Sequence, residues 1–465
     1  MGDTGSTTPT PQVFSGRRLE RRRMHCECAK NMGFFPFLNH PIRKSFKRLP
    51  TTTEWAHFQQ YARRMRKLRE EDAPSPSSPE VASVMQLCTI SEPLLPNLKD
   101  LCLQGIGGWF IPFIPLFLSP RTTSIVLSFG SGLPGAMVAS IVASLPTLCP
   151  GLETITLYTL SRNPMVTAAV SRMLLATHRN ALQQLRVDCP LTEEASEMLY
   201  KLPNLRSLSV VIERGASLPS ASLPNLTHLE IVCDNEDGWP QLFHRATFGK
   251  LESVAFYPQS EQLGDFLGTF ERAALSSSVQ NTLSTFCLDT SYSWNPNYSS
   301  LLPFTQMVDL VIESSCDGGC SSVVDDDIII SLSRAMPKLK YLYLGDSPCR
   351  QIAPGVTVKG LVALARHCPN LSTLRVHFQV TSLSDPPAIP EMVPNPGPAA
   401  SWIDCALEVL YVWEKPMPEG SELVIALTLL RIFPRLDSIV YFDEGWEEVE
   451  DAIKRSKRII DCSSD

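Results

Sequence analysis

A short string of apolar residues recurs along most of this chain. The string is L-x-x-L-x-L, in which other apolar residues can replace leucine. Thirteen copies occur, one of them degenerate, starting at Leu98, Thr122, Leu152, Leu182, Leu205, Leu226, Leu251, Leu283, Met307, Leu339, Leu371, Leu407 and Leu436. Successive copies start 21 to 36 residues apart, with a mean of about 28. A string at this spacing indicates a repeat array, in which each unit adds one layer to a continuous core.

Each unit is predicted to contain a helix followed by a strand. The last apolar positions of the string alternate as in a strand with one buried face, whereas the segments before them, such as 325–336 and 358–368, have helical spacing. Asp327 and Thr357 are expected to cap two of these helices, and Pro337 and Pro369 to end them. The predicted fold class is α/β, a leucine-rich-repeat solenoid. It resembles the ribonuclease-inhibitor horseshoe, with parallel strands on the concave face and helices on the convex face.

The regions outside the repeats suggest how the array is organised. Residues 1–48 are predicted to be basic and largely disordered, 49–71 to form an amphipathic capping helix, and 72–80 to be a Pro/Ser-rich linker. Thr51 and Glu54 would form a capping box. The repeat domain would cover 81–465, with an inserted loop at 385–400 and a C-terminal capping helix at 444–460.

Composition and charge narrow the classes of protein that fit. Residues 1–70 carry 15 Lys and Arg against 5 Asp and Glu, which leaves 26 basic and 43 acidic residues in the rest of the chain. No apolar run is long enough to span a membrane, and the first residues lack the apolar core of a secretory signal. We therefore expect a monomeric cytoplasmic or nuclear protein with reduced cysteines. We expect no nucleic-acid partner, although the basic run 17–23 leaves a nuclear-import or RNA-binding role open.

The sequence contains no recognisable catalytic pattern. The chain lacks the glycine-rich phosphate-binding strings, the G-x-S-x-G string and the H-E-x-x-H string. His25, Cys26 and Cys28 lack a second ligand pair at zinc-finger spacing. Cys316 and Cys320 precede the acidic run 325–327, which is better explained as the start of a helix. We predict no catalytic residue, no cofactor and no metal.

The repeat register predicts which side chains face the concave surface. They lie two, four and six positions after the first residue of each string, because alternate strand residues face opposite ways. In the middle units we expect small or weakly polar side chains there: Thr154, Thr156, Ser207, Ser209, Ser253, Ala255, Thr285 and Cys287. The last units instead provide a predicted partner-binding patch, which consists of Tyr341, Tyr343, Arg375, His377, Tyr411 and Trp413. The alternative is that the 385–400 loop covers this patch.

The segment LPTTTEWAHFQQYARRMRKL at 49–68 adds a resemblance to a known family. Its W-x-x-F-x-x-Y-A-R-R-M-R-x-L pattern, followed by the repeats, resembles the fungal F-box/leucine-rich-repeat proteins over roughly residues 34–465. The resemblance implies a substrate-recognition component of a cullin-type ubiquitin ligase, whose F-box would hold a Skp-type adaptor. Residues 1–48 contain no string comparable to an F-box, so we expect the adaptor to bind only a longer form. The alternative is a leucine-rich-repeat scaffold that binds a protein partner and has no role in ubiquitination.

Overall fold

The computed structural model describes residues 51–70, 93–158, 163–177, 181–213, 221–233, 238–260, 263–290, 292, 294, 296–314, 324–346, 355–384, 405–412, 420–441 and 445–462. Residues 1–48, the linker 72–80, the loop 385–400 and Trp413 lie outside this part of the chain.

The strands form one long parallel sheet. Within the described residues its fourteen strands run in the order β1-β2-β3-β4-β5-β6-β8-β10-β11-β12-β13-β14-β15-β16, while β7 and β9 pair separately. The strands are β1 (Lys67–Glu70), β2 (Asp100–Ile106), β3 (Ser124–Phe129), β4 (Thr154–Tyr158), β5 (Gln184–Pro190), β6 (Ser207–Ile212), β7 (Ala221–Leu223), β8 (His228–Cys233), β9 (Ala246–Phe248), β10 (Ser253–Pro258), β11 (Thr285–Thr290), β12 (Asp309–Ser314), β13 (Tyr341–Asp346), β14 (Thr373–Val376), β15 (Val409–Val412) and β16 (Ser438–Tyr441). Each strand of the long sheet pairs with its neighbour in chain order, as stacked repeat units require.

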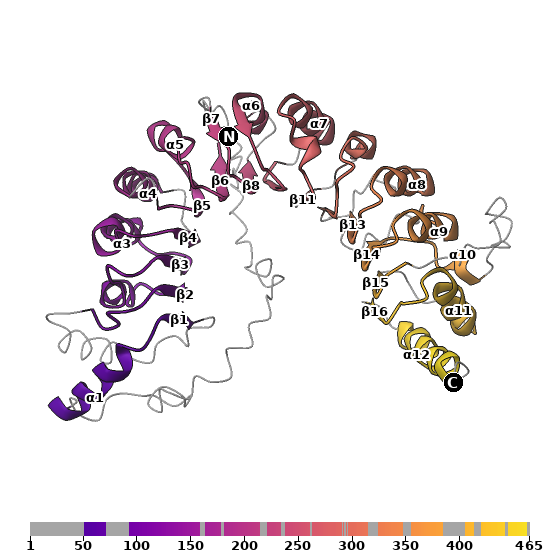
Figure 1. Ribbon diagram of the computed structural model, residues 1–465, viewed down its shortest axis with the longest axis horizontal. Coiled ribbons are helices and arrows are strands. Elements are labelled where there is room, and N and C mark those ends of the chain that lie inside the picture. The colour runs from indigo at the N-terminus through magenta and orange to yellow at the C-terminus, as the bar shows by residue number, and fades with distance from the viewer. Residues whose placement is uncertain are drawn as a thin grey trace, which may run out of the picture.

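The helices lie outside the curved sheet (Figure 1). They are α1 (Thr52–Ala62), η3 (Ile111–Leu116), α3 (Gly135–Leu148), α4 (Pro164–Ala176), α5 (Glu193–Leu199), α6 (Trp239–Arg245), α7 (Phe266–Ser276), η4 (Val279–Asn281), η5 (Tyr298–Leu301), α8 (Asp326–Ala335), α9 (Val358–His367), α10 (Thr381–Ser384), α11 (Glu422–Ile432) and α12 (Trp446–Cys462). The strands line the hollow and the helices form the outer wall (Figure 1). This confirms the predicted leucine-rich-repeat solenoid.

A ladder of main-chain hydrogen bonds fixes the register of the units. The second residue of one string accepts two amide hydrogen bonds from the next unit: the Lys99 carbonyl accepts from the amides of Thr123 at 2.9 Å and Ser124 at 3.0 Å. The same bonds recur from Arg66 to Glu408, whose carbonyl accepts from Asp437 and Ser438. The ladder satisfies main-chain polar groups where the strands begin.

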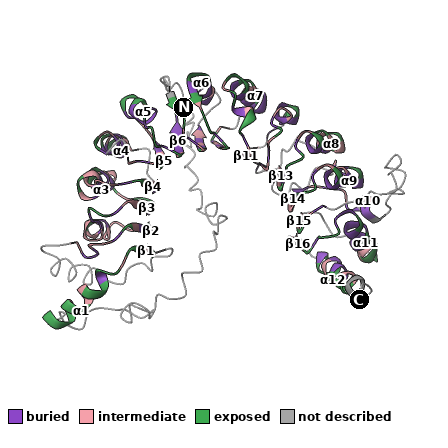
Figure 2. Ribbon diagram, viewed as in Figure 1, coloured by how far each residue is buried: buried purple, intermediate pink, exposed green. Residues whose placement is uncertain are grey.

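The apolar positions of the string fill the space between sheet and helices. The fourth residue of each string aligns with that of the next, as in Leu310, Leu342 and Leu374, and these side chains are fully buried. In the middle of the array the core becomes aromatic, since Trp239, Phe256, Phe266 and Phe270 contact one another with ring centroids 4.8 to 6.3 Å apart. Figure 2 shows that buried residues line the inner side of the helices and exposed residues their outer side. The core therefore runs without a break along the solenoid.

The N-terminal end differs from the prediction. The helix expected over 49–71 ends at Ala62, and residues 67–70 form β1, which pairs with β2. Its string is M-x-x-L, from Met65 to Leu68, and lacks the third apolar residue, which explains why the repeat search missed it. The array thus starts before the predicted boundary at 81, and residues 72–80 lie in the chain between two strands of one sheet.

The helix α1 has the predicted start and carries part of the predicted apolar face. The Glu54 amide donates to the Thr51 hydroxyl at 3.3 Å, and the Thr51 amide donates to the Glu54 carboxylate at 2.8 Å, so the capping box is confirmed. Trp55 and Phe58 stack with centroids 5.0 Å apart and pack against the core. Met65 and Leu68 also reach the core, but from the turn and the strand that follow the helix.

Candidate functional site

Three neighbouring strands near the C-terminal end bring together most of the predicted patch. Tyr343 in β13 is the register partner of Arg375 in β14, and Arg375 is the partner of Tyr411 in β15. The centre of the Arg375 guanidinium lies 3.6 Å from the Tyr343 ring centroid and 5.9 Å from that of Tyr411. Its Nη2 atom lies 3.9 Å from Glu313 Oε1, which comes from β12. We call Tyr341, Tyr343, Arg375 and Tyr411 the tyrosine–arginine cluster.

The members of this cluster differ in their exposure, which the sequence did not predict. Tyr343 and Arg375 retain only 3% and 7% of their accessible surface, whereas Tyr341 and Tyr411 are half-buried. A partner can therefore reach Tyr341 and Tyr411 more readily than Tyr343 and Arg375. Side chains on a concave face converge, and the long Arg375 side chain covers the tyrosine ring on the adjacent strand, about 4.8 Å away.

The remaining patch residues follow the strands. His377 comes directly after β14, and its ring packs beside Gly345, where an added Cβ would lie 3.0 Å from the histidine Cδ2.

Burial raises the pKa of the Tyr341 hydroxyl; the charges of Tyr411 and Glu313 raise it further and that of Arg375 lowers it. Tyr341 therefore keeps its proton and can donate a hydrogen bond at neutral pH.

A second cluster on the concave face was not predicted. Arg186 in β5 reaches past β6 to β8, where its Nη2 donates to Glu230 Oε1 at 2.7 Å. The Arg186 guanidinium centre also lies 5.0 Å from the ring of Tyr158 in β4. We call these three residues the Arg186 cluster. All three occupy concave positions of their strings, so the register that identified the C-terminal patch could also have found them.

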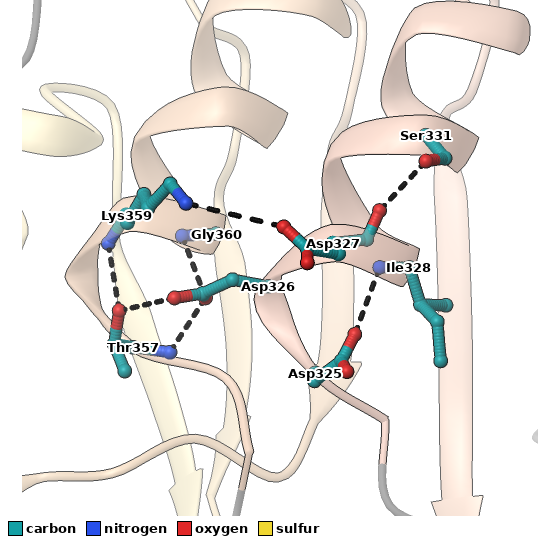
Figure 3. A network of polar contacts seen from close by, with 8 residues as sticks. All are labelled: Asp325, Asp326, Asp327, Ile328, Ser331, Thr357, Lys359 and Gly360. Carbon is teal, nitrogen blue, oxygen red and sulfur yellow. Dashed lines mark hydrogen bonds and ion pairs between the residues drawn. The ribbon is translucent and has the colours of Figure 1, made fainter.

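The acidic run before α8 organises the helices (Figure 3). Asp325, not Asp327 as predicted, is the N-cap of α8, where its carboxylate accepts from the Ile328 amide at 2.9 Å. Thr357 caps α9 as predicted and accepts from the Lys359 amide at 3.2 Å. Cys316 and Cys320 lie outside the described residues. Within the described part of the chain, no group of three or more His, Cys, Asp or Glu side chains is placed to hold a metal ion.

Asp326 connects two neighbouring units. Its carboxylate in α8 accepts from the Thr357 amide at 2.8 Å, the Thr357 hydroxyl at 2.6 Å and the Gly360 amide at 2.9 Å (Figure 3). It thereby satisfies amide groups at the N-terminus of α9, which have no partner within that helix. The contact requires a glycine, because a Cβ at residue 360 would lie 2.6 Å from Asp326 Oδ1.

We expect Asp326→Ala to lower the free energy of unfolding by about 2 kcal/mol, because buried α9 amides lose their acceptor. Gly360→Ala should also be destabilising, by about 1 kcal/mol, although alanine normally favours a helix over glycine. The control is Asp327→Ala, since the Asp327 side chain is 89% exposed, and its effect should stay below about 0.5 kcal/mol. Urea unfolding of the three variants would measure this, and stabilisation by Gly360→Ala would contradict the close contact.

The buried cysteines are poor nucleophiles. Burial raises the pKa of the Cys149 thiol to about 11 and those of Cys189 and Cys368 to about 12. The Cys405 thiol donates to the Cys368 carbonyl at 3.6 Å, and the Cys368 thiol donates to the Met336 carbonyl at the same distance. These thiols therefore act as packing groups that bind main-chain oxygens from one unit to the next.

Comparisons with known proteins identify no family for this chain. No family model matches the chain, and no curated protein is similar to it. Among solved structures, the leucine-rich repeat-containing protein LegL7 from Legionella pneumophila matches 84% of this chain and 96% of its own length, with 13% identity and a TM-score of 0.30. No described helix is long and apolar enough to cross a membrane. The leucine-rich-repeat assignment rests on the fourteen parallel strands and their continuous ladder.

Proposed function

We propose that this chain is a non-catalytic scaffold that binds a protein partner on its concave face. The observation that carries the proposal is the tyrosine–arginine cluster. In it, Arg375 is fixed between two tyrosine rings and beside Glu313, while Tyr341 and Tyr411 remain half-buried at the surface. Tyrosine and arginine contribute more than other residues to the energy of protein interfaces, especially where neighbouring groups hold them rigid. His377, which follows β14, extends the proposed surface.

The finer proposal is that the bound protein is a substrate for ubiquitination. The support is the resemblance of residues 49–68 and the repeats to F-box/leucine-rich-repeat receptors, in which the solenoid holds the substrate. The alternative is a scaffold of the same shape without a ubiquitin role. Both require the same concave surface, so binding at the tyrosine–arginine cluster tests the shared part of the proposal.

Tyr411→Ala is expected to weaken partner binding by about 2 kcal/mol, or roughly thirtyfold, with little change in stability. Tyr341→Ala should act in the same direction. The measurement is the affinity of each variant for a protein recovered with the parent chain, together with a thermal melt. Tyr61→Ala is a matched control because Tyr61 is 53% exposed on α1, away from the concave face. Equal affinity of Tyr411→Ala and Tyr61→Ala would exclude the cluster as the binding surface.

A second prediction concerns the adaptor of cullin-type ligases. Because residues 1–48 contain no F-box-like string, this chain of 465 residues is expected not to bind a Skp-type adaptor. Co-purification with the adaptor, followed by calorimetry, measures it. Binding at micromolar affinity or better would show that the N-terminal segment provides an adaptor site of another kind, and would favour the ligase role over the plain scaffold.

A further inference from the structure

The concave face carries more carboxylates than cationic groups. At the predicted concave positions from β5 to β14 there are five carboxylates and two guanidinium groups, Arg186 and Arg375. The carboxylates belong to Asp188, Glu230, Asp289, Asp309 and Glu313. No lysine or arginine occupies a concave position on the intervening strands β6 to β13. The concave positions between β5 and β14 therefore carry a net negative charge.

The two arginines show how this face holds a guanidinium group. Arg186 lies over the Tyr158 ring and donates to Glu230, and Arg375 lies over the Tyr343 ring and pairs with Glu313. In both cases the arginine lies over a tyrosine ring on the adjacent strand. A glutamate that lies two strands away in the sheet provides the negative charge. The same construction occurs on β4 to β8 and again on β12 to β14, so it does not depend on one local packing arrangement.

The strands between the two clusters also carry tyrosine and carboxylate side chains at the concave positions, but no arginine. Tyr257 in β10 and Asp289 in β11 directly follow the register partners Phe256 and Leu288, and Asp289 is the register partner of Glu313 in β12. Their neighbours on the concave side are small, including Ser253, Ala255 and Cys287. A side chain from another polypeptide can therefore approach the sheet between tyrosine and carboxylate groups.

We propose that the concave face between β5 and β14 recognises a partner segment rich in arginine and lysine, whose cationic groups bind to the tyrosines and carboxylates of the central strands. This inference rests on the proposed function and specifies the chemistry of the partner. Arginine suits such a site better than lysine because its planar group stacks on an aromatic ring while it donates to a carboxylate. The binding should weaken with salt, as expected for partly exposed charges.

The test uses the full chain and two labelled synthetic peptides, one of alternating arginine and serine and one of alternating glutamate and serine. Fluorescence anisotropy should show binding of the arginine peptide alone. The double variant Asp289→Asn/Glu313→Gln should weaken this binding about tenfold. The control Glu252→Gln/Glu408→Gln removes the same charge from exposed residues just before β10 and β15, and should change affinity less than twofold. Glu230→Gln provides an independent variant, and a thermal melt checks that each folds.

Several outcomes would overturn the proposal. They are no binding of the arginine peptide, equal binding of both peptides, or equal losses in the double variant and its control. Tighter binding after replacement of the arginines in 17–23 by glutamine would assign the face to the basic segment of this same chain, and not to a partner. If Tyr411→Ala weakens partner binding while the two peptides bind alike, the proposed function stands and this inference fails.

Discussion

Replacing Trp446 by alanine is expected to lower the free energy of unfolding by about 3 to 5 kcal/mol, the usual cost of removing a large buried aromatic side chain. Trp446 begins α12, is fully buried, and its ring centroid lies 6.4 Å from that of Phe378. Val449 and Ile453 are buried on the same face of the helix, whereas Lys454 pairs with Glu450 at 2.8 Å. The helix packs against α11 and β16, the last layers of the array.

The reason for so large an effect is the position of α12 in a stacked array. Each inner unit is covered by neighbours on both sides, but the last unit has one neighbour and depends on a cap. Deleting residues 444–465 should therefore reduce both solubility and the melting temperature. We expect Trp446→Phe to be much milder, because the ring volume is largely kept and the indole Nε1 has no hydrogen-bond partner within the described residues.

Urea unfolding of the Trp446 variants would separate these effects. Unchanged stability of Trp446→Ala, together with an unchanged melting temperature after the deletion, would mean that α12 is not the cap.

The predicted span of 444–460 agrees closely with the observed start at Trp446 and end at Cys462, since the apolar spacing of Trp446, Val449 and Ile453 marks the helix directly.

The fold could be predicted because the pattern that identifies it is repeated. A single L-x-x-L-x-L string has little meaning, but thirteen copies fix the strand, the buried face and the stacking at once. The strand β1 was not predicted because its string departs from the repeat. Glu70 occupies the position where the third apolar residue would lie. The N-cap of α8 was misplaced because three successive aspartates offer equivalent caps, and only the helix start selects Asp325.

The candidate site was predicted only in part. The alternation in the sequence shows on which face of the sheet a side chain lies, but not how far its neighbours bury it. Alternation correctly places Tyr343 and Arg375 opposite the core leucines, as the buried Leu342 and Leu374 show. It cannot show that one concave side chain covers another. The register could likewise place Tyr158, Arg186 and Glu230 on the concave face, but not show that Arg186 reaches across β6 to Glu230 in β8.

The buried position of Tyr343 leads to a second large effect. Tyr343→Ala is expected to lower the free energy of unfolding by about 3 to 4 kcal/mol, because it removes a buried ring and the cation–π contact with Arg375, 3.6 Å away. In this variant the Arg375 side chain also loses the ring that supports it and faces a cavity instead. Tyr343→Phe keeps the ring and should cost less than about 1.5 kcal/mol.

A double-mutant cycle with Tyr343→Ala and Arg375→Ala can isolate the contact itself. The coupling energy should be about 1 to 2 kcal/mol, since the guanidinium is largely removed from water and lies directly over the ring. Additive losses in the cycle would mean that the two side chains are buried independently of each other. If Tyr343→Ala instead left stability unchanged and weakened partner binding as strongly as Tyr411→Ala, Tyr343 would be a direct partner contact, as the register alone predicts.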